Sequence, residues 1–216
     1  MSEDRHSQAE TAELIVDPDE KARREAENGV RQFKAAIEVI RTNVQASGAG
    51  FRLTQSLILD MHQMVLQGIH PLAGTYRNTA VLIGASSHIP PRSTEVPDLV
   101  GEMCGYVNAG WTEKNAVHLA AYVLWRLNWI HAFADGNGRT ARVISYIVMS
   151  IKLNSVLPGS PTIPDLIASD KSPYYANLEE ADASWKLGHI ALAGMEKMLE
   201  AMLAEQLLSA TVEAGA

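Results

Sequence analysis

The residues best suited to chemistry lie together between His131 and Arg142, in the order His-Ala-Phe-Ala-Asp-Gly-Asn-Gly-Arg-Thr-Ala-Arg. Long apolar segments, residues 119–130 and 143–153, flank this polar stretch on both sides. A polar turn that carries two arginines is costly between buried segments unless its groups meet a ligand. The pattern therefore predicts a binding or catalytic loop.

The second half of this loop favours an anion. The turn at 136–138, Gly-Asn-Gly, immediately precedes a helical pattern, so the unpaired N–H groups of the first helical turn point into the loop with the helix dipole behind them. Arg139 and Arg142 are three residues apart and share a helix face, from which both could hold phosphate oxygens. The carboxylate of Asp135 is a hard oxygen ligand of the kind that Mg2+ takes beside substrate phosphates.

His131 supplies a group whose pKa lies near neutrality at the rim of this anion site. It could take a proton from a hydroxyl as that oxygen attacks phosphorus. The other histidines lack such neighbours: we expect surface or core positions for His62, His70, His118 and His189, and His88 is only a weak candidate for the flap described below.

The composition limits the classes of function. The chain has 216 residues and a net charge of -7, from 18 basic and 25 acidic residues, which argues against a general nucleic-acid binder or an anionic-membrane binder. The lone cysteine, Cys104, excludes an intramolecular disulfide and fits a reducing compartment. Neither an apolar signal region nor a membrane-spanning run is evident, so we expect a cytoplasmic protein.

The elements that must position the loop are helical. Residues 1–16 predict a mobile acidic arm, 17–50 an N-terminal helix, 51–208 the core domain and 209–216 a C-terminal tail. The first helix should begin at Asp17-Pro18 and bury the face that carries Val30, Phe33, Ile37 and Ile40. The segment before the loop should be the most buried, central helix. A short apolar run at 80–83 predicts a hairpin, which completes an all-α fold of about seven to eight helices with a small flap.

At this point the loop resembles the signature of the Fic (Fido) family, HPFx[DE]GNGRxxR, from which it departs only at Ala132, where the family has proline. The proline shapes the turn and takes no part in the chemistry, so its loss should matter little. Residues 74–77 and 81–91 are similar to the family's flap, and Tyr174, Tyr175 and Asp182 to its nucleotide-side helix. The resemblance covers most of residues 51–203.

This resemblance implies transfer of AMP from ATP to a Ser, Thr or Tyr hydroxyl of a target protein, or of the enzyme itself, with Mg2+ as cofactor. His131 is then the general base and Asp135 the magnesium ligand. The other phosphate-binding positions are Gly136, Asn137, Gly138, Arg139, Thr140 and Arg142. Tyr174, Tyr175 and Asp182 border the adenosine, and the flap residues Ile83, Gly84, Ala85, Ser86, Ser87 and His88 pin the main chain of the target.

The resemblance also suggests a switch. Fic proteins often carry an inhibitory helix with the pattern [ST]xxxE[GN], whose glutamate pairs with the second arginine of the signature, here Arg142. Glu27, followed by asparagine, matches the end of this pattern, although Arg23 stands where Ser or Thr is expected. Glu213 near the C-terminus is a competing candidate. Otherwise Glu27 is an exposed helix residue paired with Arg31.

Several alternatives stay open. The same fold could use another nucleotide donor or remove AMP, and the chain could also bind nucleotide as a regulator without turnover. The related Doc kinases lack the second glycine of the loop, whereas Gly138 is present here, which favours the transferase orientation of the nucleotide. Apolar helix faces in the N- and C-terminal thirds would permit a homodimer.

Overall fold

The computed structural model describes residues 7–8, 14–48 and 50–214, except for the side chains of Gln8 and of residues 212–214. In this part of the chain the elements are β1 (Ser7–Gln8), α1 (Pro18–Gln45), α2 (Gln55–Leu66), β2 (Leu82–Ile83), the 3-10 helix η1 (Ser93–Glu95), α3 (Val96–Ala109), α4 (Ala116–Ile130), α5 (Asn137–Lys152), α6 (Ile163–Ser169), α7 (Ser172–Lys186) and α8 (Ala193–Ala214). The predicted all-α class is confirmed. None of these helices has both the length and the apolar character that a bilayer-spanning segment requires.

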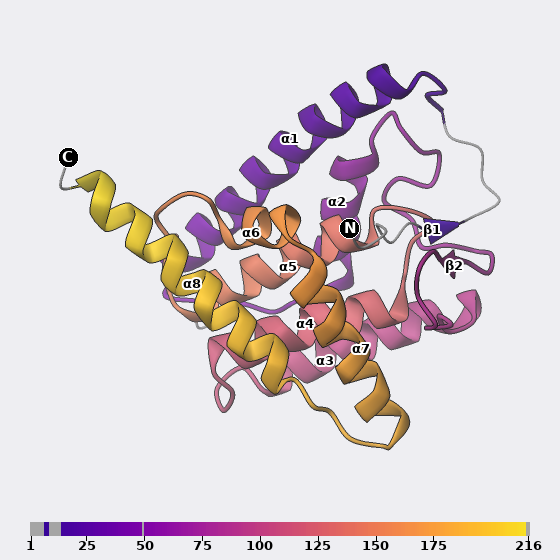
Figure 1. The fold of residues 1–216 in the computed structure, drawn as a ribbon. Coiled ribbons are helices and arrows are strands. Elements are labelled where there is room, and N and C mark those ends of the chain that lie inside the picture. The colour runs from indigo at the N-terminus through magenta and orange to yellow at the C-terminus, as the bar shows by residue number, and fades with distance from the viewer. Residues whose placement is uncertain (1–6, 9–13, 49, 215–216) are drawn as a thin grey trace.

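Helices α4 and α5 form the centre of the molecule (Figure 1). Helix α4 is buried on almost every side, as its apolar sequence predicts, and Trp125 within it is inaccessible to solvent. The two helices are also tied by a buried hydrogen bond, in which the Ser145 hydroxyl donates to the Ala120 carbonyl at 2.9 Å. The loop between them therefore starts and ends on rigid, fully packed elements.

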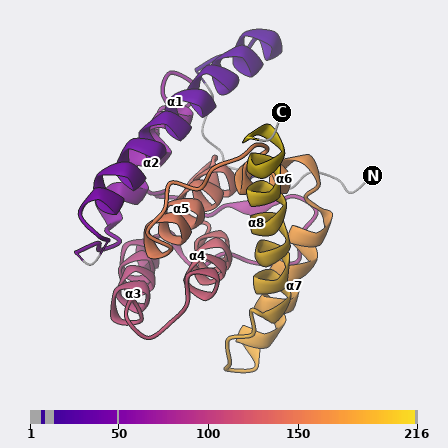
Figure 2. The same cartoon turned by 90° about the vertical axis from the view of Figure 1, so that its left-hand side faces the viewer.

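The remaining helices enclose this pair from two sides (Figure 2). Helices α1 and α2 lie along one side, and α7 and α8 lie along the other. Helix α3 packs beside α4. Because the polar loop joins the two central helices, it faces side chains from the first helix and from α7.

Helix α1 begins where the Asp17-Pro18 pair predicts it. The Asp17 carboxylate accepts a hydrogen bond from the Glu20 backbone N–H at 2.7 Å, and proline occupies the first helical position. The predicted buried face was partly wrong, because Val30 is 56% exposed.

Two polar side chains lie on the buried side of α1 in place of Val30. Asn28 donates to the carbonyls of Val65 and Gln67, and Gln32 donates to the carbonyl of Met61. The amide nitrogens of both side chains thus bind carbonyls of α2 and of the residue that follows it, whereas the buried Oδ1 of Asn28 has no hydrogen-bond partner among the described residues. Hydrogen bonding to α2 thus sets the rotation of α1.

The predicted flap hairpin is wrong. Strand β2 pairs in antiparallel fashion with β1, with Ser7 opposite Ile83 and Gln8 opposite Leu82. The segment that follows β2 does not return as its partner, since Ala85 adopts a left-handed backbone (φ 53°) and residues 90 and 91 are prolines, which lack the N–H that a ladder needs. The flap is therefore completed by the N-terminal arm, of which residues 1–6 and 9–13 lie outside the described residues.

Helix α8 secures the turn that follows α5. The Gln206 side chain is inaccessible to solvent; its oxygen accepts from the Ile163 N–H at 2.9 Å, and its nitrogen donates to the Tyr146 hydroxyl at 3.0 Å. The same nitrogen lies within hydrogen-bond distance of the carbonyls of Leu157 and Pro158. The helix continues through Ala214, into the segment predicted as a tail.

We predict that Gln206→Ala lowers the free energy of unfolding by about 2 to 4 kcal/mol, because it leaves several buried backbone groups without a partner. Urea unfolding followed by circular dichroism measures this change. Glu205→Ala, at an exposed position of the same helix, is the control and should change stability by less than about 0.5 kcal/mol. Equal stability of the two variants would contradict the assignment.

Candidate active site

The loop between α4 and α5 is fixed by its own backbone. His131 ends α4 in a left-handed conformation (φ 49°), and Gly136 precedes α5 with φ 76°. Asn137, the first residue of α5, reaches back to Phe133 in this loop. Its amide oxygen accepts from the Phe133 N–H at 2.9 Å, and its amide nitrogen donates to the Phe133 carbonyl at 2.7 Å. These two hydrogen bonds from one side chain close the loop and fix its conformation.

The N-terminus of α5 faces this loop. None of the described side chains caps the helix, so the N–H groups of its first turn are available to an anion. Gly136 is required at the cap for two reasons. Its backbone is left-handed, and a Cβ atom there would lie 3.3 Å from the His62 ring and from the Val65 side chain.

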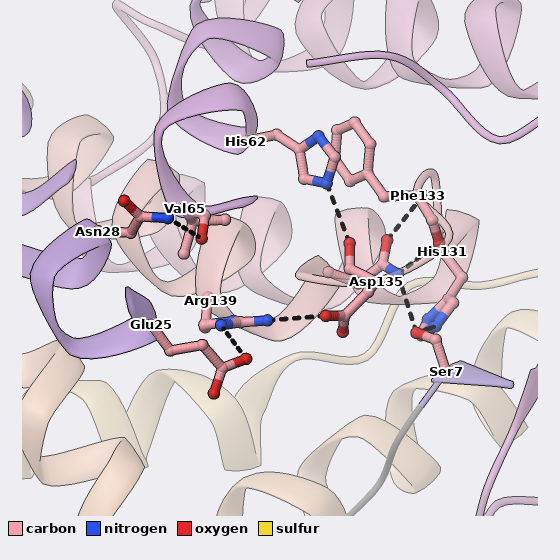
Figure 3. A network of polar contacts seen from close by, with 10 residues as sticks. Ser7, Glu25, Asn28, His62, Val65, His131, Phe133, Asp135 and Arg139 are labelled. Carbon is pink, nitrogen blue, oxygen red and sulfur yellow. Dashed lines mark hydrogen bonds and ion pairs between the residues drawn. The ribbon is translucent and has the colours of Figure 1, made fainter. Parts of the chain in front are cut away.

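The hydrogen bonds of His131 define its tautomer. Nδ1 lies 3.4 Å from the Asn128 carbonyl, which can only accept, so Nδ1 carries the proton and Nε2 presents its lone pair. Nε2 lies 2.8 Å from the hydroxyl oxygen of Ser7 (Figure 3). That hydroxyl also accepts from the Asn137 amide nitrogen at 3.3 Å. The imidazole is therefore oriented to accept a proton from a hydroxyl.

Burial favours the neutral form of this imidazole. Desolvation lowers the pKa of His131 to about 4, and the positive charge of Arg77 acts in the same direction. At neutral pH the ring is uncharged and Nε2 is an acceptor. The histidine predicted as a base is thus in the protonation state that a base requires.

Arg77 ties the segment before β2 to the end of α4. Its side chain is 3% exposed and its Nε donates to the His131 carbonyl at 2.8 Å, while its backbone N–H donates to the Ala132 carbonyl at 3.0 Å. The guanidinium also donates to the carbonyls of Thr79, Pro91 and Ile130. One buried arginine thereby fixes the flap and the base relative to each other.

His62 holds the other side of the loop. Its ring stacks on Phe133 at 3.6 Å between centroids; Nε2 donates to the Asp135 carbonyl at 3.0 Å, and Nδ1 accepts from the Gly74 N–H at 3.1 Å. Both ring nitrogens are therefore satisfied only in the neutral form. Burial lowers the pKa of His62 to about 4.

Arg139 lies between two carboxylates (Figure 3). Its Nη2 is 2.9 Å from an oxygen of Asp135, and its Nη1 is 2.9 Å from an oxygen of Glu25. The three side chains are about one third exposed, so solvent reaches the pairs. Glu25 comes from the first turns of α1, and it therefore brings a negative charge from the first helix to the end of the loop where α5 begins.

A cavity of about 520 Å³ opens above these groups. The loop and α5 line it with His131, Ala134, Asp135, Gly136, Asn137, Gly138, Arg139 and Arg142. Helix α7 contributes Tyr174, Tyr175, Leu178 and Asp182, and the flap contributes Ile83, Ser86 and His88. Lys21 and Lys171 also line it, so four cationic side chains gather in a chain whose net charge is -7.

Helix α7 forms the apolar and aromatic side of the cavity. The rings of Tyr174 and Tyr175 lie 5.6 Å apart between centroids, and both line the cavity although they are neighbours in sequence. The Asp182 carboxylate accepts from the Trp125 indole N–H at 2.8 Å and lies 3.7 Å from Nδ1 of His88. The nucleoside-side prediction thus concerns residues that share one cavity with His131.

Some predicted site residues lie elsewhere. Glu27 does not line the cavity; it is on the exposed side of α1 and pairs with Arg23 at 3.4 Å and Arg24 at 3.9 Å. Thr140 is fully buried, and its hydroxyl has no hydrogen-bond partner among the described residues. Within the flap, Gly84, Ala85 and Ser87 are not among the lining residues, and the Glu213 side chain lies outside the described part of the chain.

Three contributors were missed by reasoning from the sequence. Glu25 is two residues from the predicted Glu27, and only the rotation of α1 against α2 decides which carboxylate faces the loop. His62 was expected to be a surface or core residue. Ser7 lies in a segment without periodicity, so no pattern in the sequence could have placed its hydroxyl beside His131.

The loop and its surroundings are similar in sequence to known proteins. The profile of the Fic/DOC family matches residues 52–149. Residues 52–149, which include the whole polar loop, are therefore similar to the Fic/DOC family. A protein of Nematostella vectensis named "Protein adenylyltransferase Fic" is 32% identical over 128 residues, which are 58% of this chain and 28% of that protein. One of Caenorhabditis briggsae, "Protein adenylyltransferase fic-1", is 33% identical over 127 residues, 58% of this chain and 23% of that protein. The chain thus spans about a quarter of the length of these relatives.

Solved structures show the same fold. Fic-1 from C. elegans superimposes with a TM-score of 0.66 at 20% identity, covering 89% of this chain and 53% of that chain. A Fic family protein from Desulfovibrio desulfuricans gives a TM-score of 0.64 at 17% identity, covering 94% of this chain and 56% of that chain. The helical Fic fold expected from the loop signature is confirmed.

The two buried histidines predict an acid-sensitive fold. Since the pKa of His62 and of His131 falls from 6.5 to about 4 on folding, the unfolded chain binds protons at higher pH than the folded chain. Stability should be complete above pH 6.5 and should decline as the pH falls toward 4. Urea unfolding between pH 7.5 and pH 4 measures this decline.

His62→Gln should make the decline shallower than in the wild type, because one of the two titrating rings is gone. His189→Gln is the control, since this side chain is exposed in the loop before α8, and it should follow the wild-type curve. An unchanged slope in His62→Gln would contradict the role given to this ring.

Proposed function

We propose that this protein is an adenylyltransferase that transfers AMP from ATP to a Ser, Thr or Tyr hydroxyl of a protein. The observation that carries the proposal is the neutral His131, whose Nε2 lone pair faces a hydroxyl at the rim of a cavity that contains two arginines and an uncapped helix N-terminus. The relatives named above support AMP as the transferred group.

The cavity suits a nucleoside triphosphate. Arg139, Arg142 and the first-turn N–H groups of α5 offer charge and hydrogen bonds to phosphate oxygens. On the opposite side, the partly exposed Tyr175 ring offers a surface on which a nucleobase could pack, next to the Tyr174 ring, which is only 1% exposed. A transferred phosphorus would then lie between these two groups, next to Nε2 of His131.

His131 performs the proton transfer in this mechanism. As the acceptor hydroxyl attacks the α-phosphorus, its proton moves to Nε2, and pyrophosphate leaves. The hydrogen bond from Nδ1 to the Asn128 carbonyl keeps the ring in the required tautomer. Arg77 binds the His131 backbone carbonyl and so fixes the position of His131 relative to the flap. The negative charge of a bound triphosphate would raise the pKa of His131 and so strengthen it as a base.

The donor set at Asp135 fits magnesium carried by the nucleotide. The carboxylate lines the cavity and is partly exposed, whereas no group of three or more His, Cys, Asp and Glu side chains in the described ranges could hold a metal ion alone. Mg2+ commonly takes one or two carboxylates together with phosphates and waters. When bound, it would neutralise charge that develops on the phosphates.

We predict that His131→Ala lowers the rate of AMP transfer by about 100- to 10,000-fold without a matching loss of ATP binding, because the variant removes the base and leaves the phosphate groups in place. Radiolabelled ATP measures transfer to the chain itself and to proteins of a cell lysate, and calorimetry measures binding. Undiminished transfer would contradict the assignment of the base. Competition with unlabelled UTP, GTP and CTP tests whether another nucleotide is the preferred donor.

Glu25 is in position to restrain this activity. Its carboxylate holds Nη1 of Arg139 and adds negative charge at the place proposed for the phosphates. A triphosphate must therefore displace Glu25 from Arg139 before that arginine can bind it fully. We propose that Glu25, and not Glu27, is the carboxylate of the first helix that opposes nucleotide binding.

Glu25→Gln should tighten ATP binding by about fivefold, which corresponds to the roughly 1 kcal/mol of a partly exposed ion pair. Glu27→Gln is the matched control, since it changes the same charge on the exposed side of the same helix, and it should leave the affinity unchanged. Calorimetric titration of the two variants distinguishes them. Tighter binding in Glu27→Gln alone would refute this assignment.

A further inference from the structure

The hydroxyl of Ser7 occupies the position that an acceptor substrate requires. Its oxygen lies 2.8 Å from Nε2 of His131, the atom proposed to take the proton. It also accepts from the Asn137 amide nitrogen, so its own proton is left for the imidazole. Figure 3 shows Ser7 at the tip of β1, pointing toward the ring.

The backbone around Ser7 is bound as a recognised peptide would be. Ser7 and Gln8 pair in antiparallel fashion with Ile83 and Leu82 of the flap. Such strand addition fixes an extended segment through its main chain and directs alternate side chains to one side. The side chain directed toward the cavity at this register is the serine.

The hydrogen bonds that fix the loop do not require the Ser7 hydroxyl. The loop is closed by Asn137, braced by His62 and tied to the flap by Arg77, all through bonds that do not involve Ser7. The Ser7 hydroxyl accepts one hydrogen bond from the Asn137 nitrogen at 3.3 Å, and it meets the proton acceptor at the edge of the cavity that contains Asp135 and Arg139.

We propose that Ser7 is an internal acceptor, so that the chain transfers AMP to its own Ser7. This inference rests on the proposed adenylyltransferase function. The Ser7 oxygen forms a bond to the α-phosphorus of ATP while the bond from that phosphorus to the bridging oxygen breaks. Pyrophosphate leaves with the electron pair, and the Ser7 proton passes to Nε2 of His131. The product is an AMP phosphodiester on Ser7, with no oxidant or reductant required.

The same placement makes β1 a competitor of other acceptors. While Ser7 is paired with the flap, the hydroxyl of a target protein cannot reach Nε2 of His131. Removal of the Ser7 hydroxyl therefore abolishes modification of this segment and leaves the base and the cavity unaltered, although the main chain of residue 7 can still pair with the flap.

The test is to incubate the full chain with ATP and Mg2+, to count AMP groups by intact mass and to locate them by peptide sequencing in a mass spectrometer. Wild type should carry one AMP, on Ser7, and Ser7→Ala should lose at least about tenfold of the label because the nucleophile is gone. Ser169→Ala, which removes an exposed serine hydroxyl at the end of α6, is the matched control and should label as the wild type does. Label on another residue, undiminished in Ser7→Ala, would overturn the inference.

A mixing experiment tests whether the acceptor is internal. His131→Ala retains Ser7 but lacks the base, and Ser7→Ala retains the base but lacks the acceptor. Transfer within one chain predicts that the His131→Ala chain in the mixture is labelled at less than about one tenth of the wild-type rate. Labelling at the full rate would show transfer between molecules and would overturn the internal assignment.

Cell lysate added to Ser7→Ala separates this inference from the proposed function. Labelled lysate proteins together with no AMP on Ser7 of the wild type would leave the proposed function standing and overturn the inference. If neither the chain nor the lysate is labelled by ATP, the adenylyltransferase proposal itself fails, and the inference fails with it.

Discussion

The bridge from the Asn137 amide to both backbone groups of Phe133 is the interaction on which the site depends. The chain must reverse direction between two buried helices within a few residues, and buried polar backbone cannot be left unsatisfied there. A single side chain that both donates and accepts resolves this requirement. His131 on one side of the bridge and the start of α5 on the other are consequently held at a fixed separation.

Burial has opposite effects on the two kinds of charged group around this bridge. The rings of His62 and His131 are neutral because desolvation lowers the pKa of each to about 4, and neutrality lets each satisfy a fixed donor and acceptor pattern. Arg77 stays charged and is satisfied by backbone carbonyls instead of carboxylates. The more exposed Arg139 is ion-paired with carboxylates, and there a ligand can exchange with a carboxylate. The buried side chains that fix the site are thus neutral or bound to backbone carbonyls, whereas the contacts of Arg139 that a ligand could replace are ion pairs.

Local chemistry explains what the sequence could predict. The N-terminus of α1 follows from Asp17-Pro18, and the burial of α4 follows from an apolar run too dense for an exposed helix. The polar loop could be located because burial of its charged and polar residues between apolar segments is costly unless they bind a ligand. In each case the relevant partners lie within a few residues of one another in the chain.

Long-range contacts explain the features that could not be predicted from the sequence. The choice of Glu25 over Glu27 depends on how Asn28 meets the end of α2, and the role of His62 depends on stacking against Phe133, far along the chain. The partner of β2 was predicted within the flap from the short apolar run at 80–83, whereas it comes from the N-terminal arm. Thr140 sits in the signature but points into the core, since a helix that follows such a loop must also pack.

If the proposed function holds, the pairing of β1 with β2 has a consequence for the rate at which a target protein is modified. A strand of two residues buries little surface, so its release from the flap is a local equilibrium that leaves the helical core intact. The segment is nevertheless joined to α1 by the short stretch of chain before Pro18, and a tether of this kind gives an effective concentration of the order of millimolar. A free protein in a cell seldom reaches that concentration. In the proposed reaction, a target protein must therefore bind this chain through additional surface, or bind after β1 has left the flap.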